Sequence, residues 1–142
     1  MLVRFIVPGQ PRGKARPRFA NGHAYTDEKT REYEQLVALM YKTVAGKAQF
    51  PPDTPLSVHI HTYAYIAKSA SKAKKDGMLK GQIRPMAKPD TDNIAKCILD
   101  ALNKVAYPDD KQIVELSVSK YYSDNPCVVV EITEAENTKE SL

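Results

Sequence analysis

Val58-His59-Ile60-His61-Thr62-Tyr63-Ala64-Tyr65-Ile66 alternates aliphatic or small side chains with imidazole and aromatic ones. Successive side chains of a β-strand point to opposite faces of its sheet, so this period of two predicts a strand with one buried face. The other face of the predicted strand is polar and aromatic. His59 and His61 share it and are candidate metal ligands, although we favour the interpretation that they only make that face polar.

Helical spacing of apolar residues is found on both sides of this strand. Apolar side chains recur every three or four positions in 27–45 and again in 93–106, the spacing that buries one face of a helix. Thr26 or Asp27 is suited to cap the first helix and Asp92-Asn93 the second, because short polar side chains accept hydrogen bonds from a first helical turn. We therefore expect two main helices.

Three further segments have strand character. Residues 2–7 form a short β-branched run that stops at Pro8-Gly9. Residues 114–118 and 128–132 alternate apolar and polar side chains on either side of Ser123-Asp124-Asn125-Pro126, which is typical of a turn. We expect these last two strands to pair as a terminal hairpin.

The chain has 142 residues, of which 42% are hydrophobic and 27% charged, the composition of one globular domain. The order β-α-β-loop-α-β-β predicts a single-domain α+β fold with a mixed sheet of about four strands and two main helices. The domain is expected over 1–133, and 134–142 is expected to be a frayed acidic tail.

No apolar run reaches the roughly 20 residues that a membrane span needs, and Met1–Val7 is too short for a secretory signal. We therefore expect no membrane partner and a cytoplasmic location. Cys97 and Cys127 lie far apart in the chain, which fits neither a zinc site nor a disulfide framework. Both are expected to be buried thiols.

Basic side chains gather in two stretches of the chain, 12–18 and 68–88. The net charge is +4, and the acidic tail makes the rest of the protein more basic than this total. Basic clusters interrupted by Gly, Pro and Ser suit the backbone of a nucleic acid, while a solvated charged surface is the alternative. Residues 68–87 lack periodicity and are predicted to be a DNA-tracking loop with room for a short helix. The candidate DNA-binding residues are Arg12, Lys14, Arg16, Arg18, Lys72, Lys74, Lys75 and Lys88.

Acidic residues flank the second predicted helix. Asp90 and Asp92 lie at its start, on extended backbone that would point both carboxylates the same way, and Asp109-Asp110 follows its end. Converging carboxylates on a basic protein fit Mg²⁺, which prefers hard oxygen ligands, neutralises phosphate charge and activates water. Lys96 lies one turn beyond Asp92 and can face the same cleft.

Each of these features also has a structural interpretation: a helix cap at Asp92, an ion pair from Asp92 to Lys96, and a turn at Asp109-Asp110. Distance matters as well, because the predicted helix is roughly 20 Å long. Asp110 can therefore join Asp90 only if the strand that follows it pairs near the segment carrying Asp90. The sequence leaves this pairing open.

Two motifs resemble those of one known family. Lys88-Pro89-Asp90-Thr91-Asp92-Asn93-x-x-Lys96-x-x-x-Asp100-Ala101-Leu102-Asn103, followed by Asp109-Asp110-x-Gln112-Ile113, resembles the core signature of RusA-type Holliday-junction resolvases. The earlier Pro8-Gly9-x-Pro11-x-x-Lys14-x-Arg16-x-Arg18-Phe19 is similar to that family's basic N-terminal segment, and Lys120 fits its lysine on the following strand.

The resemblance implies that Asp90, Asp92 and Asp110 are metal-binding catalytic carboxylates and that Lys96 is the catalytic lysine. It also implies Mg²⁺ as cofactor, with Mn²⁺ as a substitute, and a homodimer that cuts four-way junctions by paired nicks. Asp100 matches the pattern, and both a structural and a catalytic role are open for it. Many proteins of this kind are encoded by prophages.

Three functions are therefore compatible with the sequence. The first is a Mg²⁺-dependent, structure-selective endodeoxyribonuclease that resolves Holliday junctions in DNA recombination and repair. The second is a non-catalytic module that binds branched DNA, in which the acidic residues only cap and turn the backbone. The third is a magnesium nuclease of other branched DNA, which would use the same residues.

Overall fold

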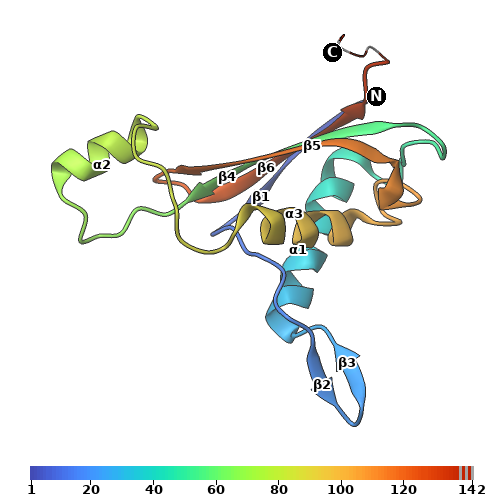
Figure 1. Cartoon of the computed structure of the whole chain (residues 1–142), viewed down its shortest axis with the longest axis horizontal. Helices are drawn as coiled ribbons and strands as arrows, with labels where there is room; N and C mark the ends of the chain where they lie inside the picture. The colour runs from blue at the N-terminus through green and yellow to red at the C-terminus, as the bar shows by residue number, and fades with distance from the viewer. Residues whose placement is uncertain (138, 140, 142) are drawn as a thin grey trace.

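The structure, a computed structural model, describes residues 1–137, 139 and 141. Residues 138, 140 and 142, which belong to the predicted tail, lie outside the described residues. The described residues form one α+β domain, which confirms the predicted fold class (Figure 1). Its elements are β1 (Leu2–Pro8), β2 (Arg18–Ala20), β3 (His23–Tyr25), α1 (Glu28–Ala45), β4 (Leu56–Ala64), α2 (Lys72–Leu79), α3 (Thr91–Leu102), the short 3₁₀ helix η1 (Asp110–Gln112), β5 (Ile113–Tyr122) and β6 (Cys127–Glu134).

The main sheet has the order β1-β6-β4-β5, and the predicted terminal hairpin is wrong. β5 runs parallel to β4, so that Ile60 lies opposite Val118, and β6 pairs antiparallel with the other edge of β4. The reason is the long connection through α3, since a crossover returns the chain parallel to the strand it left. The link between β5 and β6 passes the end of β4, where the Ser123 amide donates to the Ala64 carbonyl at 2.9 Å.

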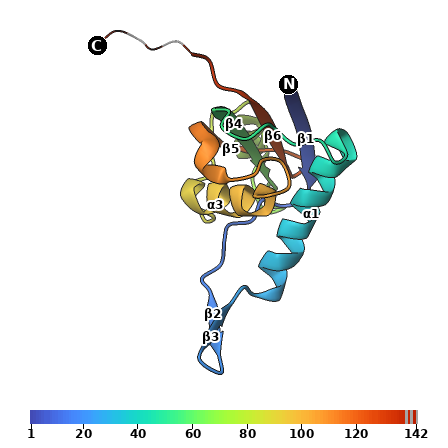
Figure 2. The same cartoon turned by 90° about the vertical axis from the view of Figure 1, so that its right-hand side faces the viewer.

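Helices α1 and α3 pack side by side against one face of this sheet (Figure 2). The core between the layers is apolar. Its fully buried side chains include Val37 and Tyr41 from α1, Ile94, Ile98 and Leu102 from α3, and Val58, Ile60 and Ile132 from the sheet. The alternation in β4 is as predicted. On its second face the His59 ring makes hydrogen bonds with the hydroxyls of Ser57 (3.2 Å) and Ser117 (2.6 Å).

The helix boundaries differ from prediction at α3. Asp27 caps α1 as expected, and its carboxylate accepts a hydrogen bond from the Thr30 amide at 3.2 Å. In α3, by contrast, the N-cap is Asp90 rather than Asp92-Asn93. The helix ends at Leu102 rather than near 106, because its C-cap Asn103 is in extended backbone (φ −60°, ψ 127°) and Lys104 then adopts a positive φ of 66°. The chain then turns tightly, and the buried Tyr107 donates its hydroxyl to the Leu99 carbonyl at 3.0 Å.

Two small elements lie at the periphery of the domain. The predicted 68–87 loop contains α2, which begins at the capping residue Ser71 and lies beyond one end of the sheet (Figure 1). The hairpin β2–β3 projects from the domain beyond the start of α1 (Figures 1 and 2). It turns at Asn21-Gly22, where both φ angles are positive (52° and 77°), as a tight hairpin turn requires.

Cys97 is buried as predicted, whereas Cys127 is only half-buried, and both are free thiols. In the part of the chain that the structure describes, no helix combines the length and the apolar character needed to cross a membrane. β6 continues through Glu134, one residue into the predicted tail, and the Ala135 amide donates to the Pro55 carbonyl at 2.9 Å.

Candidate functional site

The start of α3 presents two exposed carboxylates. Asp90 is the N-cap in extended backbone (φ −71°, ψ 154°), yet its side chain accepts no capping hydrogen bond from the described residues. Asp92 follows in the first helical turn. The partial positive charge of a helix N-terminus stabilises both anions. Both carboxylates therefore remain available to an external cation.

Lys96 and Asp100 follow along α3. Lys96 is exposed, and no ion pair joins it to Asp92 within residues 1–137, 139 and 141. The alternative interpretation, in which Asp92 and Lys96 form an ion pair, is therefore wrong for the described residues. Asp100 is half-buried and is 3.3 Å from the Lys14 ammonium.

Asp109 and Asp110 have different environments although they are adjacent. Asp109 caps η1: its carboxylate accepts from the Lys111 amide at 3.0 Å, and its own amide donates to the Gln112 side chain at 3.3 Å. The hydrogen bond from the Lys111 backbone lowers the pKa of Asp109. The turn interpretation therefore holds for Asp109.

The Asp110 carboxylate, by contrast, lies among like charges. Partial burial, together with the hydrogen bond and charge of Asp109 and the charge of Asp100, raises the pKa of Asp110 above the usual aspartate value. Its backbone amide donates to the Asn103 side chain at 3.1 Å, which ties η1 to the end of α3. The Asp100–Asp109–Asp110 region thus carries excess negative charge that a bound cation would neutralise.

The structure does not join the two acidic ends of α3. The helix has 12 residues, so the carboxylates at its two ends are separated by about 18 Å along its axis. The segment carrying Asp90 does contact β5, but near Lys120, whose ammonium donates to the Ala87 carbonyl at 2.7 Å. Asp110 precedes the opposite end of that strand, roughly 23 Å away. Among the described residues, no three Asp, Glu, His or Cys side chains form a group that could hold one metal ion.

Lys14 is placed differently from the other basic residues. Its side chain is only 15% exposed, and its ammonium pairs with both Glu34 of α1 and Asp100 of α3. Burial alone lowers the pKa of Lys14, but these two carboxylates outweigh that effect and raise it. The predicted DNA-binding role therefore competes with an internal one, in which Lys14 connects the N-terminal segment to both helices.

The residue before Lys14 shows how closely this segment packs against α3. A side chain at Gly13 would come within 2.9 Å of Pro89 and 3.0 Å of Asn93, so only glycine fits there. The Lys14 amide also donates to the Asn93 carbonyl at 3.0 Å.

A basic cleft of about 590 Å³ lies between this segment and the start of α3. Arg12, Arg16, Lys29 and Lys88 bring positive charge to it, and Asp90 lies at its edge. Lys29 was not among the predicted DNA-binding residues, because a single lysine in the first turn of a helix gives no sequence signal. Lys14, whose charge is paired with Glu34 and Asp100, and Asp27 also line it. The cleft thus combines five cations with two carboxylates, one of which is the candidate catalytic Asp90.

The remaining predicted DNA-binding residues lie outside this cleft. Lys72, Lys74 and Lys75 are exposed on α2, where Lys75 is 3.6 Å from the Asp124 carboxylate. Arg18 is exposed at the start of the projecting β2–β3 hairpin. The predicted DNA-binding residues therefore occur on three separate parts of the molecule: the cleft, α2 and the hairpin.

Comparison with known proteins gives two findings. Residues 8–133 match the protein family described as "Endodeoxyribonuclease RusA". The "Uncharacterized protein YqaN" of Bacillus subtilis (strain 168) is 40% identical over an alignment of 142 positions that covers 93% of this chain and 96% of that protein. The family match spans α3, both acidic pairs and the basic cleft.

Proposed function

Because the chain belongs to the RusA endodeoxyribonuclease family, we propose that it is a Mg²⁺-dependent, structure-selective nuclease that resolves four-way DNA junctions by paired nicks. Its role would lie in DNA recombination and repair. The observation that carries this proposal is the basic cleft with Asp90 at its edge. Cations that hold a phosphate next to an exposed carboxylate are what hydrolysis of a phosphodiester needs.

The donor atoms in this region fit Mg²⁺. Asp90 and Asp92 are exposed carboxylates at one end of α3, and Asp110 at the other end lies in a region of excess negative charge. Mg²⁺ in phosphate-processing sites commonly uses only one or two carboxylates, with waters and phosphate oxygens as its other ligands. A group of three protein ligands is therefore not required. When bound, Mg²⁺, or Mn²⁺ in its place, would neutralise phosphate charge and lower the pKa of a bound water.

We assign the roles within this proposal as follows. Asp90 and Asp92 would hold the metal ion at the cleft, and Asp110 would hold a cation in the region of excess negative charge at the other end of α3. Lys96, which is exposed one turn beyond Asp92, stabilises negative charge on the phosphate or protonates the leaving oxygen. Arg12, Arg16 and Lys88 bind the phosphates of the strand in the cleft. Arg18, Lys72, Lys74 and Lys75 contact more distant parts of the DNA, because they project from the hairpin and from α2.

We further propose that the active form is a homodimer. A four-way junction has approximate two-fold symmetry, and two-fold dimers are the commonest small oligomers. Matching the two axes would put one cleft on each of two opposing strands. One protomer makes one nick, so paired cleavage requires two.

The test is incubation of the purified protein with a synthetic four-way junction, a flap and a plain duplex, each with Mg²⁺ or with excess chelator. We expect symmetric nicks in the junction, in Mg²⁺ only, and loss of cleavage with retained binding in Asp90→Asn and Asp92→Asn. Junction binding without cleavage in any divalent metal would instead indicate a binding module. Equal cleavage of flaps and junctions would indicate a general nuclease of branched DNA.

A further inference from the structure

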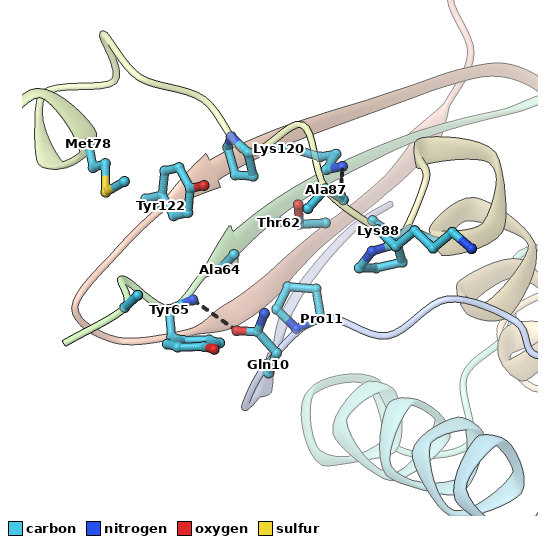
Figure 3. A pocket seen from close by; sticks show the side chains of 14 residues that line it. Gln10, Pro11, Thr62, Ala64, Tyr65, Met78, Ala87, Lys88, Lys120 and Tyr122 are labelled. Carbon is cyan, nitrogen blue, oxygen red and sulfur yellow. Dashed lines mark hydrogen bonds between the residues drawn. The ribbon is translucent and has the colours of Figure 1, made fainter. Parts of the chain in front are cut away.

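A second hollow adjoins the basic cleft. This apolar cavity has a volume of about 280 Å³ and shares Pro11, Lys88 and Pro89 with the cleft, so the Lys88-Pro89 segment forms a wall of both (Figure 3). The Lys88 side chain extends away from the cavity (Figure 3). One hollow is therefore basic and the other largely apolar, and they are immediate neighbours.

Aromatic and apolar side chains surround the cavity. Tyr65, Tyr122 and Met78 line it (Figure 3), and its other apolar lining residues include Ile94 and the shared prolines. Tyr65 is 58% exposed although it directly follows a core strand. A nucleobase stacks on aromatic rings whatever its identity, because every base has a π-face.

A few polar groups are fixed at defined places in the same cavity. The Gln10 side-chain oxygen accepts from the Tyr65 amide at 2.8 Å, which leaves the Gln10 NH₂ group to donate. The Thr62 hydroxyl donates to the Ser119 carbonyl at 3.1 Å and keeps its lone pairs as acceptors. An apolar pocket with a few positioned donors and acceptors is typical of a site for a flat, polar-edged ligand.

The wall between the two hollows is held in place by contacts to β5. The Arg84 guanidinium lies 3.8 Å from the centre of the Tyr121 ring, and its Nε donates to the Lys120 carbonyl at 2.6 Å. The Lys120 ammonium in turn holds the Ala87 carbonyl. These contacts keep the segment before Asp90 in one position, which preserves the apolar cavity when no DNA is bound.

We propose that the apolar cavity accepts one unstacked nucleobase of the DNA strand whose phosphates lie in the basic cleft. The inference rests on the proposed function and deepens it. Unstacking a base costs least where it is already unpaired or poorly stacked, as at a branch point. A site that requires an unstacked base beside the candidate catalytic carboxylates would therefore favour branched DNA over plain duplex.

The test combines base removal in the DNA with ring removal in the protein. Binding of a fluorescent four-way junction is measured by anisotropy in chelator, with single abasic sites placed in turn across the branch point. We expect one position at which base loss weakens wild-type binding about tenfold, as expected for one stacked base. Tyr122→Ala should weaken binding of the intact junction by a similar factor, and the abasic site at that position should weaken it no further. Tyr122→Phe keeps the ring and should bind as wild type.

Tyr65→Ala gives the same test at a side chain that is more exposed than the half-buried Tyr122. The cavity inference would be overturned if the loss from the abasic site added to the loss from Tyr122→Ala and to that from Tyr65→Ala. It would also be overturned if no position in the scan were sensitive to base removal. Both outcomes would leave the proposed function intact. Equal binding of junction and duplex by the wild type, without cleavage in Mg²⁺, would overturn the proposed function and the inference with it.

Discussion

The pairing of Lys14 with Glu34 and Asp100 leads to a prediction that separates stability from DNA binding. We consider Lys14→Met, which keeps an unbranched apolar stem of similar length and removes the charge. The Lys14 side chain is 15% exposed, Glu34 is 21% exposed and Asp100 is 36% exposed. The variant would leave two carboxylates without their cation, and one of them, Asp100, also repels Asp110.

The expected cost lies between two known limits. An exposed ion pair contributes about 0–1 kcal/mol, whereas removing one member of a fully buried pair costs roughly 3–5 kcal/mol. The partial exposure of this triad places the loss of unfolding free energy at about 2 kcal/mol. For a chain of this size that corresponds to a decrease in Tm of about 6 °C.

Arg16→Ala is the matched control, because Arg16 is an exposed cation of the basic cleft only two residues away. It should leave Tm within about 1 °C of wild type and flatten the plot of log affinity against log salt by about one unit. Lys14→Met should show the opposite pattern, with a lower Tm and an unchanged salt slope. The measurements are thermal unfolding and junction binding at several salt concentrations. An unchanged Tm in Lys14→Met, together with a flattened slope, would refute the internal role and return Lys14 to the DNA-binding residues.

Three further predictions concern the acidic residues and the distant basic surfaces. Asp110→Asn should abolish junction cleavage in Mg²⁺, whereas Asp109→Asn should retain much of this activity, because asparagine can still cap η1. Junction cleavage assays of both variants test this, and an equal loss of activity in the two would contradict their separate roles. The Lys74→Ala/Lys75→Ala double variant should weaken binding without base preference and flatten the salt slope, and an unchanged slope would return α2 to ordinary solvated surface. Because the pKa of Asp110 is raised, the folded protein keeps the proton of this carboxyl to a higher pH than the unfolded chain does. Ionisation of Asp110 therefore destabilises the folded state. This destabilisation is absent below the unfolded pKa, grows as pH rises through the folded pKa and is complete above it. In chelator, Asp110→Asn should therefore melt higher than wild type at pH 7, and the difference should vanish at pH 3; a constant difference across this range would argue against the repulsion.

Local patterns in the sequence were sufficient to predict most of the secondary structure. The alternation in β4, the capping residue Asp27 and the helical periodicity of α1 depend on neighbouring residues only, and the structure agrees with each. The turn at Asn21-Gly22 is equally local, and its Asn-Gly signal would have predicted the β2–β3 hairpin. The motif around Asp90 is local as well, and its residue types and spacing were enough to indicate the family.

Contacts between distant segments depended on the tertiary structure. Alternation shows that a strand has a buried face but not which strand lies beside it, so the crossover through α3 determined that β5 pairs with β4 rather than with β6. No local pattern marks Glu34 as the partner of Lys14, since the two residues meet only when the N-terminal segment packs against α1 and α3. The separation of Asp90 from Asp110 has the same origin: the sequence determines which residues are acidic, whereas the length of α3 and the place where residue 87 meets β5 determine how far apart they lie.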